Sequence, residues 1–149
     1  MTNYYETKVS YVKTDTETEK KKKEKATYLV TGVSFGDAEA DAVGVFERTA
    51  DYDCAELTIE AVRKVSFGQI KVLDEKRDPS NWFVVSLAYE DESDKSNNIV
   101  DTKLVNAGSQ NELNKFIESE LNDTINVATF DKRYVKSVKN VRYEHVSTF

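Results

Sequence analysis

Two nine-residue stretches of the chain, VRKVSFGQI and VKNVRYEHV, place valines, a base, an aromatic residue and a final β-branched residue at matching positions. They cover residues 62–70 and 138–146, so they begin 76 positions apart. A chain that contains an internal duplication should repeat other landmarks at nearly the same distance. The near-repetition therefore predicts that the two halves of the chain fold alike.

Other landmarks do recur at this distance. The stretch YLVTGVSFGDAEADAVGVF aligns with KLVNAGSQNELNKFIESEL at an offset of 75, and YYETKVSYV aligns with NWFVVSLAY at an offset of 77. We therefore expect internal repeats over residues 1–75 and 80–149, joined by a short linker around Pro79, the only proline. At 149 residues with 39% hydrophobic content, the chain is expected to form one domain over 1–149 with a shared core.

Each half shows the pattern of a hairpin, a helix and a strand. Over residues 5–11, every second position (Tyr5, Thr7, Val9 and Tyr11) alternates with Glu6, Lys8 and Ser10, which is typical of a half-buried strand. The segment ATYLVTGV is expected to form the strand that returns beside it. The segment KTDTETEKKKKEK between them is polar throughout, which predicts a protruding, mobile hairpin tip.

Helix starts are the clearest local signals. Ser34 precedes Asp37 by three residues, and Ser109 precedes Glu112 by three, which is the spacing of a capping box. Helices are therefore predicted over residues 34–47 and 109–121. Each would turn an apolar stripe toward a sheet, namely Ala38, Ala42, Val45 and Phe46 in the first and Leu113, Phe116, Ile117 and Leu121 in the second.

The nonapeptides follow neither a period of 2 nor one of 3.6, so each is interpreted as a strand with an irregularity or bulge. The resulting prediction is an α+β fold made of two tandem ββαβ repeats. The repeats would share a mixed or antiparallel sheet, with both helices on one face and a pseudo-two-fold axis between them.

The opening NYYETKVSYVKTDTETEKKKKEKATYLVTGVSFGDAEA, VRKVSFGQI and a second strand beginning WF carry a resemblance over most of the chain. The sequence resembles a domain-of-unknown-function family of small proteins, about 150 residues long, from Bacteroides-group bacteria and their phages. The resemblance implies a similar fold and a bacterial or phage origin. It implies no site residue, because the shared features are structural.

Catalytic and metal-binding functions are not expected. His145 and Cys54 are the only histidine and cysteine, and no base with an orienting third group accompanies either residue. The glycines form neither a dinucleotide fingerprint nor a phosphate loop, and the acidic clusters lack the spacing of a calcium loop. The chain is therefore predicted to be no enzyme and to carry no cofactor or metal.

No apolar stretch approaches the roughly 20 residues of a membrane span, and the N-terminus has no signal-peptide core. We therefore expect no membrane association. The expected location is the cytoplasm, or the virion if a phage encodes the protein.

Two basic segments are candidate nucleic-acid contacts. Both could follow phosphates, and Tyr134 and Tyr143 could stack on bases. The simpler interpretations are a solvated loop and a protected sheet edge, and the net charge of −6 opposes long-range attraction to nucleic acid. The candidate residues are Lys20, Lys21, Lys22, Lys23, Lys25, Lys132, Arg133, Lys136, Lys139 and Arg142.

Aromatic content favours protein binding. The chain has 8 tyrosines, 7 phenylalanines and one tryptophan, more than two short helices over one sheet need to cover. Tyr4, Trp82, Tyr89 and Tyr143 are candidates for an exposed sheet face. The sequence therefore predicts a non-catalytic interaction protein that binds another protein or self-associates. A single-stranded nucleic-acid-binding protein is the alternative.

Overall fold

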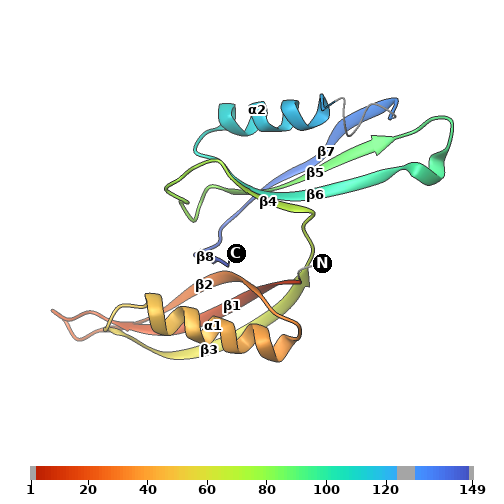
Figure 1. Ribbon diagram of the computed structural model, residues 1–149. Coiled ribbons are helices and arrows are strands. Elements are labelled where there is room, and N and C mark those ends of the chain that lie inside the picture. Colours follow the sequence, from red (N-terminus) through yellow and green to blue (C-terminus); the bar gives the residue numbers. More distant parts are fainter. Residues whose placement is uncertain (1–2, 124–129, 148–149) are drawn as a thin grey trace. The chain divides into compact units, whose positions relative to one another are not determined.

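The computed structural model describes residues 3–123 and 130–147, and the chain forms two compact units (Figure 1). Unit 1 consists of Met1–Ser66 together with Tyr143–Phe149, and unit 2 consists of Phe67–Arg142. The C-terminal segment thus belongs to the unit that contains the N-terminus.

Unit 1 is a four-stranded sheet with one helix, in the strand order β3-β1-β2-β8. Its elements are β1 (Tyr4–Thr14), β2 (Lys21–Thr31), α1 (Phe35–Thr49), β3 (Cys54–Val65) and β8 (His145–Val146). The three long strands are antiparallel, and β8 lies parallel to β2. Helix α1 covers one face of the sheet, where Ala38, Ala42 and Val45 pack into a core with Tyr5 and Val30.

Unit 2 has the same kinds of element, in the strand order β4-β6-β5-β7. Its elements are β4 (Gln69–Val72), β5 (Trp82–Glu90), the 3-10 helix η1 (Lys95–Asn97), β6 (Ile99–Asn106), α2 (Gln110–Leu121) and β7 (Lys132–Val141). Strand β4 lies parallel to β6, and the other pairs are antiparallel. Leu113 and Ile117 of α2 pack on Val85, Leu87 and Val105 of the sheet.

The α+β class is confirmed, but the expectation of one shared sheet is wrong. Each helix covers a face of its own four-stranded sheet. The order ββαβ occurs in both units. The tandem duplication itself stays a prediction.

The nonapeptides explain why there are two sheets. Each contains the end of a long antiparallel strand and then a short parallel strand of the other sheet: β3 is followed by β4, and β7 is followed by β8. Residues 66–68 and 142–144 separate these strands. The irregular spacing therefore marks a change of sheet within each nonapeptide, where a bulge was expected.

Both helix starts are confirmed. The Ser34 side chain accepts a hydrogen bond from the Asp37 backbone N–H, and Ser109 accepts one from Glu112, each at 3.2 Å. In turn, the Asp37 and Glu112 carboxylates each accept a hydrogen bond from the backbone N–H of the residue before the capping serine. These donors are Val33 and Gly108, both at 3.3 Å.

The lysine run is placed differently from the expectation. Lys21 pairs with Thr14 in register, so β2 begins inside the run and the turn is limited to residues 15–20. Carboxylates beside the lysines favour this regular strand, because Glu24 and Glu60 lie 3.7 Å and 3.5 Å from Lys22 and Lys23. The predicted mobile tip is therefore mostly hairpin strand.

Candidate functional site

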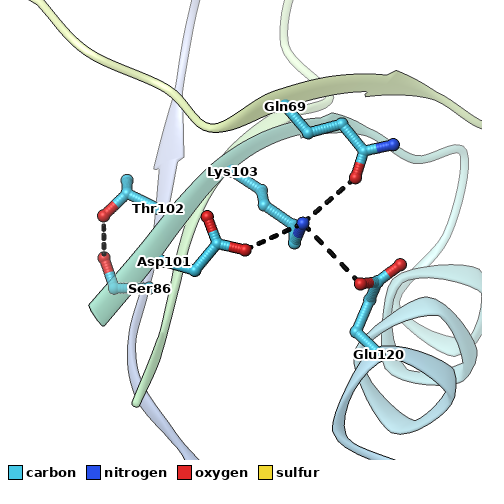
Figure 2. Close-up of polar contacts among 6 residues, drawn as sticks. All are labelled: Gln69, Ser86, Asp101, Thr102, Lys103 and Glu120. Atoms are coloured by element: carbon cyan, nitrogen blue, oxygen red, sulfur yellow. Dashed lines mark hydrogen bonds and ion pairs between the residues drawn. The ribbon is translucent and has the colours of Figure 1, made fainter. Parts of the chain in front are cut away.

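A buried lysine holds three elements of unit 2 together. Lys103 of β6 is only 7% exposed and lies on the face covered by α2. Its Nζ lies 2.9 Å from Asp101 Oδ2, 3.1 Å from Gln69 Oε1 of β4 and 3.6 Å from Glu120 Oε2 of α2 (Figure 2). An ammonium group has three N–H donors. Asp101 and Gln69 lie within hydrogen-bonding distance of it, and Glu120 adds an ion pair. The residue therefore acts as a fastening point between α2, β6 and β4.

Neighbouring groups fit closely around this lysine. A side chain at Gly68 would collide with the Asp101 carboxylate, so glycine permits β4 to approach β6 at this point. Burial raises the pKa of Tyr89, and the carboxylates of Asp101 and Glu120 raise it further, so this hydroxyl stays neutral. Across the strand pair, the hydroxyls of Ser86 and Thr102 lie 3.2 Å apart (Figure 2).

The fastening is one-sided, and a groove lies along the other side of α2. Lys103 ties the helix to β6 and β4, whereas β7 is at the opposite edge of the sheet. Between α2 and β7 lies a groove of about 610 Å³. It is lined by Asn114, Ile117, Glu118, Leu121 and Asn122 from α2 and its C-cap and by Asp131, Arg133, Val135 and Val138 from β7 and the residue before it.

The groove has an apolar wall that the helix does not cover. Val135 is 39% exposed and Val138 is 44% exposed, although both belong to the strand that faces α2 across the groove. In register they stand beside Leu87 and Val85, which are fully buried. The sheet's apolar surface therefore continues outward onto β7 and is open there.

Arg133 supplies an unpaired donor to this groove. Its Nη1 is buried and has no hydrogen-bond partner among the described residues. The nearby Asp131 carboxylate already accepts a hydrogen bond from the Glu92 backbone N–H at 2.8 Å. A buried donor without an acceptor is costly, so this nitrogen marks a position suited to an incoming oxygen.

Strand β7 also has a free edge, in the sense that no described strand pairs with its outer side. It pairs with β5 on one side and ends the strand order on the other. The register shifts between Ser86 and Leu87, which leaves Lys136 as an extra residue of β7. An unpaired edge beside an apolar groove is a geometry that accepts an added strand.

Comparison with known protein families assigns the chain to one family. The model of the family described as Domain of unknown function (DUF4494) matches residues 3–146. The chain belongs to the DUF4494 family. Comparisons with curated proteins and with solved structures give no match. The domain-of-unknown-function resemblance is therefore confirmed, and membership assigns no site.

In this DUF4494 chain the two basic segments lie in different units. Lys20 is in the turn after β1, and Lys21, Lys22, Lys23 and Lys25 are on β2 of unit 1; Lys132, Arg133, Lys136 and Lys139 are on β7 of unit 2, which Arg142 follows. Several of these cations have acidic neighbours, including Lys132, whose Nζ lies 3.9 Å from Glu90.

The expectation of an exposed aromatic face is wrong for three of its four residues. Trp82, Tyr89 and Tyr143 are 2%, 4% and 3% exposed, and Tyr4 is half-buried. Tyr89 belongs to the core under α2. The Tyr143 hydroxyl donates a hydrogen bond of 2.9 Å to Glu6, and burial and that carboxylate raise the pKa of Tyr143. Trp82, Tyr89 and Tyr143 are therefore core residues.

Sequence reasoning missed Val135, Val138 and Lys103. The valines are three positions apart, and only the extra residue Lys136 brings both to the same side of β7. The single available signal was the broken alternation in this strand. Within residues 3–123 and 130–147, no helix is both long and apolar enough to cross a membrane, and no group of acidic, histidine or cysteine side chains could hold a metal ion.

Proposed function

We propose that this DUF4494 protein is a non-catalytic interaction protein that binds another protein or a second copy of itself. The observation that supports this proposal is the groove between α2 and β7. It combines two half-exposed valines, a buried unpaired guanidinium nitrogen and a free strand edge. These are features that a partner's apolar and hydrogen-bonding groups would satisfy.

The surroundings of Cys54, His145 and Lys103, the side chains best suited to catalysis, support a non-catalytic role. Burial and the neighbouring Asp53 raise the pKa of Cys54, whereas a nucleophilic thiol requires a lowered one. The His145 ring lies 3.2 Å from the Ser147 hydroxyl at the end of β8. Lys103 is occupied by two carboxylates and an amide.

Origin and location remain proposals that rest on the resemblance described above. We propose an accessory protein of a bacterium or a phage. It would act in the cytoplasm of the cell or, if encoded by a phage, in association with the virion.

A capture experiment tests the proposed function. Tagged protein would be used to capture partners from its native host, with and without nuclease, while sedimentation velocity measures self-association. Wild type would be compared with Val138→Lys in the groove and with Val33→Lys as the matched control, since Val33 is 86% exposed and lies in unit 1. We expect nuclease-resistant association that only Val138→Lys weakens. Association unaffected by Val138→Lys would refute a role for the groove.

Single-stranded nucleic-acid binding is the second proposal, and the lysines of β7 favour it. Lys136 and Lys139 are exposed on the edge strand near Tyr134, an arrangement that could combine phosphate contact with stacking. The Tyr134 hydroxyl, however, donates a 3.0 Å hydrogen bond to Glu90, which places a carboxylate at the same surface.

A titration with fluorescent oligonucleotides separates the two proposals. At about 0.15 M salt, where charges more than roughly 8 Å apart are screened, we expect no binding of single strands at micromolar concentration. Micromolar binding that is lost when Lys136, Lys139 and Arg142 are changed to glutamine would favour nucleic acid over a protein partner.

A further inference from the structure

We infer that the groove between α2 and β7 accepts an extended acidic peptide segment of a partner protein, which adds as a strand along β7. The inference rests on the proposed function and names the chemistry of its partner. Three features of the groove specify that chemistry: its apolar wall, its unpaired arginine nitrogen and the charge of the strand edge.

The apolar wall requires alternating apolar side chains. Val135 and Val138 are open toward the groove, while Ile117 and Leu121 of α2 line its other side. A peptide lying along β7 directs every second side chain to the same face. Apolar residues at those positions would enter the space between the helix and the strand, where burying each methylene group is favourable.

The unpaired arginine nitrogen requires an oxygen acceptor. Arg133 Nη1 is buried in the groove wall, so its N–H groups have already lost contact with water. A carboxylate is the acceptor that matches a guanidinium best, because both its charge and its planar geometry complement the donors. Glu118 and Asp131 also line the groove, which restricts the favourable position for a partner's carboxylate to the surroundings of Arg133.

The charge of the edge strand selects between a second copy and a different partner. Lysines on an edge strand, and bulges such as the one at Lys136, discourage pairing between like edges. Two β7 strands would bring Lys132, Lys136 and Lys139 of both copies together, and like charges on paired strands are destabilising. An acidic strand turns the same lysines into favourable cross-strand partners. The occupant is therefore an acidic segment of another protein.

The geometry limits the length of the added strand. The extra residue at Lys136 interrupts the edge, and the stretch from residue 137 to the end of β7 at Val141 is regular. This stretch contains Val138 and suits a paired segment of about five residues, the usual length of a short strand. The peptide would continue past the bulge at Lys136 to reach Val135 and Arg133.

Selection from a random dodecapeptide display library tests this inference without knowledge of the natural partner. The library would be selected on the full-length protein, and selected peptides would be titrated by fluorescence anisotropy against wild type, Arg133→Gln and Val138→Lys. Arg77→Gln is the matched control, because Arg77 is an exposed arginine of unit 2 outside the groove. Equal denaturation midpoints for Arg133→Gln and wild type would show that the substitution leaves the fold intact.

We expect the selected peptides to alternate acidic and apolar residues and to slow amide hydrogen exchange in β7. Arg133→Gln should weaken their binding on the order of tenfold or more, as expected for loss of a hydrogen bond between charged groups, and Arg77→Gln should not. Peptides whose binding is weakened by Val138→Lys but not by Arg133→Gln would refute the inference that the partner segment is acidic, while leaving the proposed function intact. No selected peptide, or selected peptides indifferent to Val138→Lys, would overturn the inference; the proposed function, which also includes a folded partner or a second copy, is tested separately by the capture experiment.

Discussion

At the residue scale, Lys103 shows how one side chain sets the position of a helix. Its side chain is 9% exposed, and its carboxylate partners are about 30% exposed, so the charges are partly shielded from water. Removing the ammonium would leave Asp101 and Glu120 facing each other without a cation. The lysine therefore fastens α2 on the side of the helix away from β7.

Replacing Lys103 with methionine is predicted to lower the free energy of unfolding by about 1–3 kcal/mol. The matched control is Lys132→Met, which removes an exposed lysine 3.9 Å from Glu90 and should cost less than about 0.5 kcal/mol. Urea denaturation measures both variants. Adding Glu120→Gln to Lys103→Met should recover part of the loss, and equal effects of the two lysine substitutions would contradict the structural role of Lys103.

His145 is the only histidine and is predicted to make unit 1 sensitive to acid. Burial lowers its pKa, the positive charge of Arg48 lowers it further, and Asp41 opposes this shift. Because the folded state binds the proton more weakly than the unfolded state, the stabilisation is fully present above the ordinary histidine pKa. It is lost as the pH falls through the lower pKa of the folded protein.

Denaturation midpoints between about pH 7.5 and pH 5 measure this effect. We expect wild type to lose stability over this range and His145→Gln to lose less. The carboxylates are common to both proteins, so the difference between them isolates the histidine. Parallel pH profiles would contradict the prediction.

At the element scale, the helix caps are the features that local sequence determines best. Ser109→Ala removes the oxygen that accepts the Glu112 N–H, and it is predicted to cost about 1 kcal/mol of unfolding free energy. Ser119→Ala, on the exposed part of the same helix, should be nearly neutral because alanine favours helices. Thermal denaturation distinguishes them, and similar midpoints for the two variants would show that the cap contributes little.

The limits of prediction are also clearest at this scale. The caps at Ser34 and Ser109 and the alternation in β1 act between near neighbours in sequence, so both helices and the first hairpin could be predicted. The pairing of β8 depends instead on Tyr28 and Leu29, more than a hundred residues away. A two-residue strand has no period to detect, so the division into two sheets could not be predicted.

The candidate site was beyond sequence analysis for a similar reason. The basic character of β7 was evident, and Arg133 was already a candidate contact. The groove, however, depends on the extra residue Lys136 and on the one-sided attachment of α2 through Lys103 and Glu120. Both are consequences of tertiary packing, which a local pattern does not contain.

At the scale of the whole molecule, each sheet is completed by a strand that follows the last long strand of the other unit. Unit 1 takes β8 after β7, and unit 2 takes β4 after β3. The C-terminal strand is well attached, because the Glu144 N–H bonds to the Thr27 carbonyl at 2.9 Å and the Ser147 N–H bonds to the Leu29 carbonyl at 2.8 Å. Folding of unit 1 therefore requires a segment that lies beyond unit 2 in the sequence.

Ending the chain after Arg142 is predicted to destabilise unit 1 selectively. The truncation removes β8 and the buried Tyr143, whose hydroxyl bonds to Glu6. Loss of a buried aromatic side chain and its hydrogen bonds should cost at least about 3 kcal/mol. Hydrogen exchange measured by mass spectrometry should show faster exchange in β2, while β5 in unit 2 keeps its protection.

Two further measurements make this prediction specific. Tyr143→Phe removes only the hydroxyl that bonds to Glu6, so it should cost about 1 kcal/mol and increase exchange in β2 by a smaller amount than the truncation. A synthetic peptide of residues 143–147, added to the truncated chain, should restore protection in β2, because the peptide can supply the missing parallel strand and the tyrosine together. Equal loss of protection in β2 and β5 after truncation would show instead that the two units unfold as one cooperative structure, with no separate role for the C-terminal strand in unit 1.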